Sequence, residues 1–183
     1  MKSTASALLV LLSMWAAAAL GATYTADTAS SRLSFAFIQA GAENTGRFGQ
    51  FSVELSLDER DPAANRLDVR IDVDSLDTQD QERDEVLRSA DLFDVAKHPV
   101  AAFSATNIKR TAPGRYEAIG NLTLRGVTRE VRVPFTLTKE RMNGGAMVRR
   151  LDFGVGQGEW ESTEWVGNGV KVTFALRMVP KKG

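Results

Sequence analysis

The chain has 183 residues, 23 basic and 23 acidic side chains with a formal net charge of zero, and 43% hydrophobic residues. This length suits one domain with a substantial core, and the balanced charge argues against the basic face that nucleic-acid binding requires. The chain contains no cysteine, so neither a disulfide nor an acylated cysteine anchor is available to it. We therefore expect a single domain without a nucleic-acid partner.

The first 22 residues have the composition of a secretory signal peptide. Lys2 gives a positive start, an apolar run covers residues 8–20, and Gly21-Ala22 supplies small residues for cleavage. The apolar run is short for a membrane span, which makes a retained anchor the less favoured interpretation. We predict a signal peptide over residues 1–22 and an exported, periplasmic domain over residues 23–183.

Most of the remaining chain alternates apolar and polar residues, the period-two pattern of β-strands with one face in water. In chain order, the expected strands cover residues 33–37, 51–57, 67–74, 100–108, 116–126, 131–137, 151–155 and 170–178. Turn signals between them include Asp61-Pro62, Pro113-Gly114, Gly126 and Asn143-Gly144-Gly145.

An antiparallel sheet of this size exposes its edges unless it closes or folds over. Eight strands that close on themselves leave an interior filled by side chains or just wide enough for one slim ligand. A two-sheet sandwich is the competing architecture, but its strands are usually shorter. The predicted fold is therefore all-β: a closed antiparallel eight-stranded, lipocalin-like barrel with one short helical insert.

The helical insert is predicted over residues 79–90, where the alternation stops and charged residues are dense. Good helix formers and early acidic residues favour a helix, with Thr78 as N-cap and Gln81 completing a weak capping box. Val86 and Leu87 give this helix a narrow apolar stripe. Such a helix suits a cover over one mouth of the barrel, but an ordinary crossover between two strands explains it equally well.

Groups able to perform catalysis or bind metals are scarce. His98 is the only histidine and cysteine is absent, so neither a zinc cluster nor a catalytic triad is indicated. Asp72 and Asp74 alternate with core residues and should face solvent, and the pair Asp58/Glu59 has no better claim to catalysis. The glycines of "GVGQGEW" lack the strand-then-helix context of a phosphate loop. We predict no enzyme, no catalytic residue, no metal, and no cofactor apart from a bound lipid or quinone.

Most phenylalanines fall on inward positions of the expected strands, and a packed core explains part of this pattern. A tunnel between them could also hold an apolar tail, since a chain of about 20 carbons would gain on the order of 10 kcal/mol before ordering costs. Ala118 and Gly120 are small inward residues that we expect to leave room for it. The predicted ligand-binding residues are Phe35, Phe37, Phe48, Phe51, Val53, Ile71, Leu87, Phe93, Phe103, Ala118, Leu122, Phe135, Phe153 and Trp160. The candidates for orienting a polar head group at the mouth are Gln39, Asn44, Arg149 and Arg150.

Trp160 and Trp165 lie in a stretch with glycines and glutamates, which we expect to connect the last two strands. They could cap the end of the barrel or sit at a membrane interface, which tryptophan favours. The neighbouring Glu159, Glu161 and Glu164 argue against an anionic lipid surface, so capping is the preferred interpretation.

Three motifs resemble those of the YceI-like family of exported lipid-binding proteins, and the resemblance runs through the whole expected mature chain. They are the central stretch "RDEVLRSADLFDVAKHPVAAF", a segment of the form G-x-L-T-x-x-G-x-T, and a first hairpin. The matching residues are Arg83-Asp84, Leu87, Phe93-Asp94, Pro99 and Phe103 in the first, Gly120, Leu122, Thr123, Gly126 and Thr128 in the second, and Ser34-Phe35 with Gly46-Arg47-Phe48 in the third.

The resemblance implies an extended β-barrel, often dimeric, whose interior holds an isoprenoid-tailed amphiphile such as a polyprenyl chain or ubiquinone. Gln39 departs from the family pattern, because many members have a histidine in this hairpin. The ending "RRLDFGVGQGEWESTEWVGNGV" resembles the variant associated with cytochrome b561-type membrane proteins, which points toward a quinone or an electron-transfer setting.

We predict a periplasmic carrier or sequestering protein that binds an isoprenoid amphiphile, either a polyprenyl lipid or a ubiquinone-like molecule, in the barrel interior. One alternative is an accessory module that docks on a cytochrome b561-type membrane electron-transfer protein. Another is an enzyme that acts on a quinone-like ligand. The expected partners are the isoprenoid lipid itself and, as further options, a second copy of the chain or the membrane cytochrome.

Overall fold

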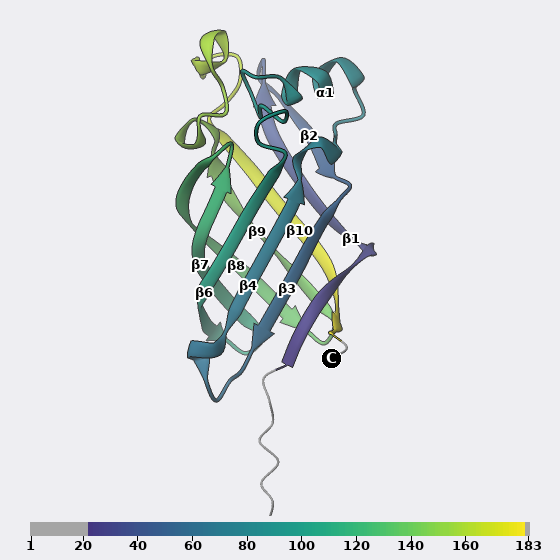
Figure 1. Ribbon diagram of the computed structural model, residues 1–183, viewed down its shortest axis with the longest axis vertical. Helices are drawn as coiled ribbons and strands as arrows, with labels where there is room; N and C mark the ends of the chain where they lie inside the picture. Colours follow the sequence, from purple (N-terminus) through teal and green to yellow (C-terminus); the bar gives the residue numbers. More distant parts are fainter. Residues whose placement is uncertain (1–21, 182–183) are drawn as a thin grey trace, which may run out of the picture.

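The structure, a computed structural model, describes residues 22–181 and has the form of an elongated β-barrel with a helix at one end (Figure 1). The predicted signal peptide lies outside the described residues except for Ala22. Within residues 22–181 there are ten strands: β1 (Ala22–Gln39), β2 (Ala42–Phe48), β3 (Phe51–Leu57), β4 (Arg66–Asp72), β5 (Leu76–Asp77), β6 (Val100–Ala112), β7 (Arg115–Leu124), β8 (Val127–Thr138), β9 (Arg141–Arg149) and β10 (Gly169–Pro180). The helix α1 spans Gln81–Arg88, and 3-10 turns cover Pro62–Ala64, Val73–Ser75, Arg150–Phe153 and Gly158–Glu161.

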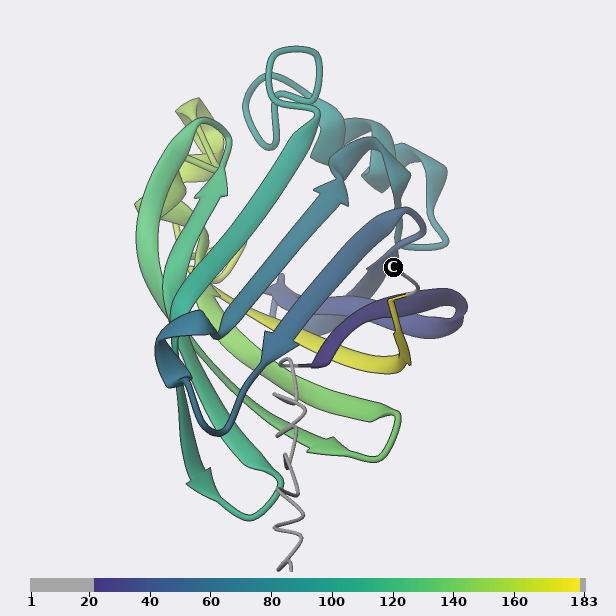
Figure 2. The same ribbon diagram turned by 60° about the horizontal axis from the view of Figure 1, so that its bottom comes forward.

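The barrel closes where β10 pairs with β1, antiparallel like its other strand pairs. The strands β1, β3, β4 and β6 to β10 form the eight-stranded wall, while β2 and the short β5 extend it at one end. Figure 2 shows β10 beside the long, curved β1. The prediction of a closed antiparallel eight-stranded barrel with one short helix is confirmed.

The strand β1 has different hydrogen-bonded neighbours at its two ends. The N-terminal part of β1 pairs with β3 (Thr25 opposite Glu54), whereas its C-terminal part pairs with β2 (Leu33 opposite Phe48). The register of β1 against β10 shifts between Asp27 and Arg32. Residues 73–99 include β5, which pairs with β2, and α1. They lie at the end of the barrel that is uppermost in Figure 1.

An ion pair attaches β5 to β2. The Arg47 guanidinium donates to Asp77 Oδ2 at 2.8 Å, and the backbone N–H of Gln79 donates to Asp77 Oδ1 at 2.8 Å. The Gln79 N–H and then Arg47 hold the pKa of Asp77 below its ordinary value. A carboxylate with a lowered pKa stabilises the fold above an unfolded-state pKa of about 4 and loses that contribution as the pH falls further.

The start of α1 differs from the predicted cap. Asp80 is the N-cap, and its side chain accepts from the Arg83 N–H at 3.1 Å. Thr78 instead donates its hydroxyl and its backbone N–H to the buried carboxylate of Asp84, at 2.7 and 2.9 Å. Gln79 has a φ of +63°, so the chain turns between Thr78 and the helix and leaves Asp80 in the capping position. The predicted capping box is therefore wrong, although the helix itself is present.

Two expectations about the last third of the chain are also wrong. Asn143-Gly144-Gly145 lies in the middle of β9 and is not a turn, and residues 151–155 do not form a strand. A Cβ on Gly144 would collide with the Pro134 carbonyl oxygen of β8, so this glycine allows a neighbouring strand to approach. The true connection between the last two strands is the loop over residues 150–168, which we call the upper loop.

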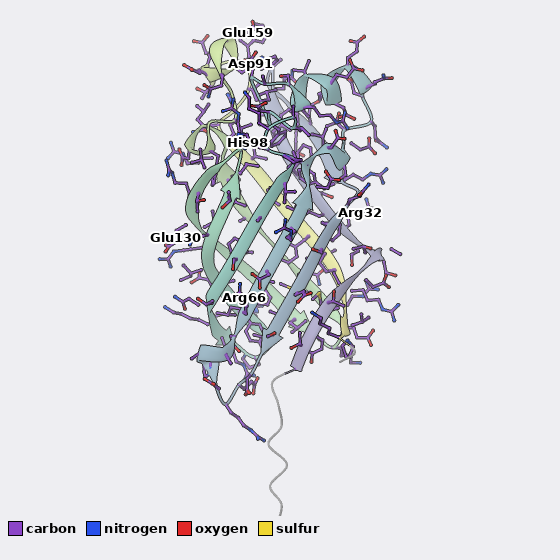
Figure 3. The ribbon with its side chains drawn as sticks, viewed as in Figure 1. Arg32, Arg66, Asp91, His98, Glu130 and Glu159 are labelled. Atoms are coloured by element: carbon purple, nitrogen blue, oxygen red, sulfur yellow. The ribbon has the colours of Figure 1, made fainter. Side chains whose placement is uncertain are left out.

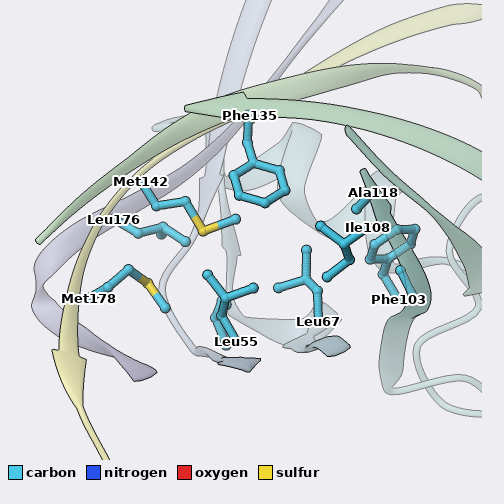
Figure 4. Close-up of a cluster of buried hydrophobic side chains, with 11 residues drawn as sticks. Leu55, Leu67, Phe103, Ile108, Ala118, Phe135, Met142, Leu176 and Met178 are labelled. Carbon is cyan, nitrogen blue, oxygen red and sulfur yellow. The ribbon is translucent and has the colours of Figure 1, made fainter. Parts of the chain in front are cut away.

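Charged side chains cover the outside of the barrel, as those of Arg32, Arg66 and Glu130 illustrate in Figure 3. The inside is not uniform along its length. In the half away from α1, buried side chains meet across the barrel (Figure 4). We call their deepest members the lower plug: Leu55, Ala105, Ile108, Ala118, Phe135 and Met178.

Candidate ligand-binding site

The half of the barrel next to α1 encloses a cavity of about 650 Å³. Its wall is formed almost entirely by apolar side chains from the strands, from α1 and from the upper loop. The exposed residues among those lining it include Ala40 and Ala42 in the β1–β2 hairpin and Val86 in α1. The cavity therefore opens between this hairpin and α1, and we call that opening the mouth.

Most of the predicted ligand-binding residues line this cavity. Eight of them come from strands far apart in the sequence, where alternation places them on the inner face of the wall, while Leu87 lies in α1, Phe93 in the segment that follows it and Trp160 in the upper loop. They are Phe35, Phe37, Phe48, Phe51, Val53, Ile71, Leu87, Phe93, Phe103, Leu122 and Trp160.

Three predicted residues lie elsewhere. Ala118 is fully buried in the lower plug, as is Phe135, whose ring stacks on Tyr116 with a centroid distance of 5.3 Å. Phe153 is buried in the 3-10 turn that begins the upper loop, behind the cavity wall. A Cβ on Gly120 would collide with the backbone of β6, so the small residues of β7 serve close strand packing and leave no tunnel. The alternation gave the inward direction correctly but contains no information about depth along the barrel.

The sequence interpretation also missed aliphatic parts of the wall. Val69, Leu124, Val131, Val148 and Val172 line the cavity together with Phe174. The same alternation that selected the phenylalanines places them on the inner face, so the available signal was their position and not their residue type.

The mouth carries a small set of polar side chains. Gln39 and Asn44 line the cavity from the hairpin, and the cross-strand partner of Asn44 is the inward Phe37. From the other side, Arg83 lines it next to Asp80, with an Nη2 to Oδ2 distance of 3.1 Å, and Glu82 lies between them in the sequence. The cationic group of the mouth is thus already paired with a carboxylate.

Arg149 does not belong to the mouth. It lies on the outer face of β9 with a side chain that is 68% exposed, and its guanidinium lies 3.7 Å from Asp152. Because β9 continues to residue 149, the side chains of Arg149 and Arg150 point to opposite sides of the wall.

Arg150 lines the cavity, but its N–H groups are all occupied. The side chain is buried, and its guanidinium donates five hydrogen bonds of 2.7–3.1 Å to backbone carbonyl oxygens of the upper loop. An arginine has five N–H donors, so none remains for a head group. Burial lowers the pKa of Arg150 from its ordinary value. The acceptors are Val155, Trp160, Ser162, Val166 and Gly167.

The match to a known family decides the identity of the domain. The model of the YceI-like domain matches residues 24–178, nearly the whole described chain. The chain belongs to the YceI-like family.

Individual relatives agree with this assignment. A UPF0312 protein of Yersinia enterocolitica is 43% identical over 93 residues, which are 51% of this chain and 48% of that protein, so the match spans about half the length of the relative. The crystal structure of BcnA from Burkholderia cenocepacia superposes with a TM-score of 0.79 at 29% identity, covering 84% of this chain and 99% of BcnA. A polyisoprenoid binding domain from Saccharophagus degradans shares the fold, with a TM-score of 0.64 at 18% identity over 86% of this chain and 98% of that domain.

The two tryptophans of the upper loop have different environments in this YceI-like domain. Trp160 lines the cavity, and its carbonyl accepts from Arg150. Trp165 is 69% exposed, and its backbone carbonyl accepts from the Ala40 N–H of the hairpin at 2.7 Å. The expectation that both rings cap the barrel is therefore wrong for Trp165.

The titratable residues considered for catalysis are dispersed in this YceI-like domain. His98 is half-buried, with its ring beside Gly126. Asp72 accepts from the Asp74 N–H at 3.1 Å and caps a 3-10 turn. Among the residues that the structure describes, no three His, Cys, Asp or Glu side chains gather as a metal site would require. Nor does any helix within residues 22–181 have the length and apolar character to cross a bilayer.

Placing a charge at Leu87 is expected to weaken binding of an apolar ligand. Leu87 is the α1 residue that packs against two buried clusters, one around Phe35 and Val73 and the other around Val148 and Phe153. Leu87→Asp would bring a carboxylate to an apolar wall, and we expect affinity for an isoprenoid alcohol to fall at least about tenfold. Glu85→Asp, on the exposed side of the same helix, is the matched control and should leave affinity unchanged. Equal affinities of Leu87→Asp and wild type, measured by tryptophan fluorescence titration, would rule out a role for α1 in covering the ligand.

Proposed function

We propose that this chain is an exported binding protein that holds the tail of one isoprenoid amphiphile in the cavity, with the polar head at the mouth. The observation that carries the proposal is an apolar cavity of about 650 Å³, open at a polar mouth and closed at the other end by the lower plug. Binding sites for small molecules are typically cavities of this size with a few polar groups that fix orientation. The polyisoprenoid binding domain from Saccharophagus degradans, which has the same fold, supports an isoprenoid as the ligand.

The charges around the mouth support an uncharged head group, such as a quinone ring or a hydroxyl. A phosphorylated head would meet the carboxylates of Asp80 and Glu82. Arg83 is paired with Asp80, and the N–H groups of Arg150 are held by carbonyl oxygens. The amides of Gln39 and Asn44, in contrast, suit hydrogen bonds with a neutral head.

Binding, and not catalysis, accounts best for these features. Apart from the mouth, the cavity wall is almost entirely apolar, and hydrophobic contact with it retains a tail without any specific polar residue. In this proposal the protein carries or sequesters the lipid in the periplasm, and no chemical step takes place.

Organic-solvent extraction of the purified protein, followed by mass spectrometry, tests the proposal. We expect an isoprenoid lipid with an uncharged head in the extract of the wild-type protein, at up to one molecule per chain. A protein that contains no such lipid, and that also takes up none when incubated with an isoprenoid quinone, would contradict the proposed function.

Export is tested by the intact mass of the protein in a periplasmic fraction. We expect a mature chain that starts near Thr23, because the apolar run of residues 8–20 ends in small residues suited to cleavage. A protein that keeps Met1, or that stays in the membrane pellet, would refute this part of the proposal.

A further inference from the structure

We propose that the lower plug limits the tail that this protein can enclose to about four isoprene units. The inference rests on the proposed isoprenoid-binding function and adds the chain length of the ligand to it. It predicts that affinity for a prenol rises with each isoprene unit up to that length and then stays level for longer tails.

The volume of the cavity sets the limit. A group of the size of a water molecule occupies roughly 30 Å³ of a liquid, so a cavity of about 650 Å³ holds roughly 20 non-hydrogen atoms. An isoprene unit contributes five carbons, and about 20 atoms therefore correspond to about four units. A longer tail must extend either downward through the barrel or out through the mouth.

The downward path is closed by packed side chains. Leu67, Phe103 and Met142 line the bottom of the cavity and are at most 8% exposed. Packed in the same cluster but outside the cavity lining, Leu55, Ala118 and Met178 are each 0% exposed, and Leu55 is the cross-strand partner of Leu67 (Figure 4). The stacked rings of Phe135 and Tyr116 lie in the same cluster. Protein interiors of this kind are close-packed, so a tail could pass only by displacing several buried side chains together.

The upward path brings no gain in affinity. Carbons that pass the mouth, between Ala42 and Val86, enter water, and only apolar surface removed from water contributes to binding. Additional units beyond about four should thus leave the affinity unchanged instead of abolishing it.

A substitution at Ala146 is expected to reduce the number of isoprene units that the cavity encloses. It lines the cavity from β9, opposite Val172 of β10 and two inward positions above Met142. Ala146→Phe would fill part of the cavity with six additional heavy atoms, which is about the size of one isoprene unit. Met147→Phe is the matched control, because Met147 is the next residue of the same strand and is 63% exposed on the outer face.

The experiment measures the affinity of full-length mature protein for all-trans prenols of 10, 15, 20, 30 and 45 carbons by tryptophan fluorescence titration. Affinities of each variant are expressed relative to wild type at the same chain length, which cancels differences in the water solubility of the prenols. For wild type, the retained chain lengths are also compared directly by offering an equimolar mixture and quantifying the bound prenols by mass spectrometry.

In the wild type, we expect no preference among prenols of 20 or more carbons but weaker retention of the 10-carbon prenol. In Ala146→Phe, we expect affinity within about twofold of wild type for 10 carbons and a loss of at least tenfold for 20 and more. Met147→Phe should match wild type at every length. If Ala146→Phe lacks a cooperative thermal transition, Ala146→Leu tests the same limit with a smaller side chain and should show a smaller loss of the same pattern.

Two results would overturn the length limit while leaving the proposed function intact: a wild-type preference that continues to rise from 20 to 45 carbons, or an equal loss at all lengths in the Ala146 variants. Failure of the wild type to bind any prenol would refute the proposed function, and the length limit with it.

Discussion

Replacing Arg150 with methionine is expected to destabilise the protein by about 3–4 kcal/mol, because five buried or partly buried carbonyl oxygens lose a charged hydrogen-bond donor. The cost is less than the sum of five hydrogen bonds, since the buried guanidinium itself carries a desolvation penalty in the wild type. For a domain of this size, the change corresponds to a fall in melting temperature of about 10 °C.

The Arg150→Met variant should also bind the ligand poorly. The carbonyls held by Arg150 belong to the loop that places Val155, Trp160 and Val166 in the cavity wall. Calorimetric melting and fluorescence titration measure the two effects. Arg149→Met is the control and should change stability by no more than about 0.5 kcal/mol, because its side chain is exposed. A melting temperature of Arg150→Met equal to that of wild type would contradict the role assigned to this arginine.

The second large effect is expected at Phe135 of the lower plug. Phe135→Ala should cost about 3–5 kcal/mol in the free energy of unfolding, the usual range for an aromatic ring removed from a packed core. Phe51→Ala should cost only about 1–2 kcal/mol, because the Phe51 ring is half-buried and faces the cavity. Urea unfolding of ligand-free protein measures both.

For the affinity of the shortest prenol, we expect the larger loss in Phe51→Ala and not in Phe135→Ala. Phe51→Ala removes a wall contact and should weaken binding of the 10-carbon prenol, whereas Phe135 lies below the cavity and should leave it unchanged. A larger stability loss for Phe51→Ala than for Phe135→Ala would mean that the cavity and the plug have been assigned to the wrong halves of the barrel.

The sequence predicted which residues face the interior but not how far along the barrel they lie. Alternation correctly placed Phe51 and Phe135 on the inner face. One of them lines the cavity and the other fills the plug, and this difference arises from long-range packing that a period-two pattern does not record. The same limitation led to the expectation that Ala118 borders a tunnel, although it is enclosed by packed side chains.

Two further expectations were wrong because they were drawn from the local sequence alone. Asn143-Gly144-Gly145 has the composition of a turn, yet in β9 its glycines make room for close neighbours. Arg150 was identified as a polar group near the mouth, but its five carbonyl partners are brought together only by the folded upper loop. No spacing in the sequence indicates that a loop will converge on one guanidinium.

The most direct test of the central claim is a crystal structure of the mature protein grown with geranylgeraniol, the 20-carbon prenol. Our account expects continuous density for one tail inside the barrel, starting at the mouth near Gln39 and ending above Met142, with the side chains of the lower plug unmoved. Density for the prenol on the outer surface, or an interior filled by protein side chains alone, would contradict it.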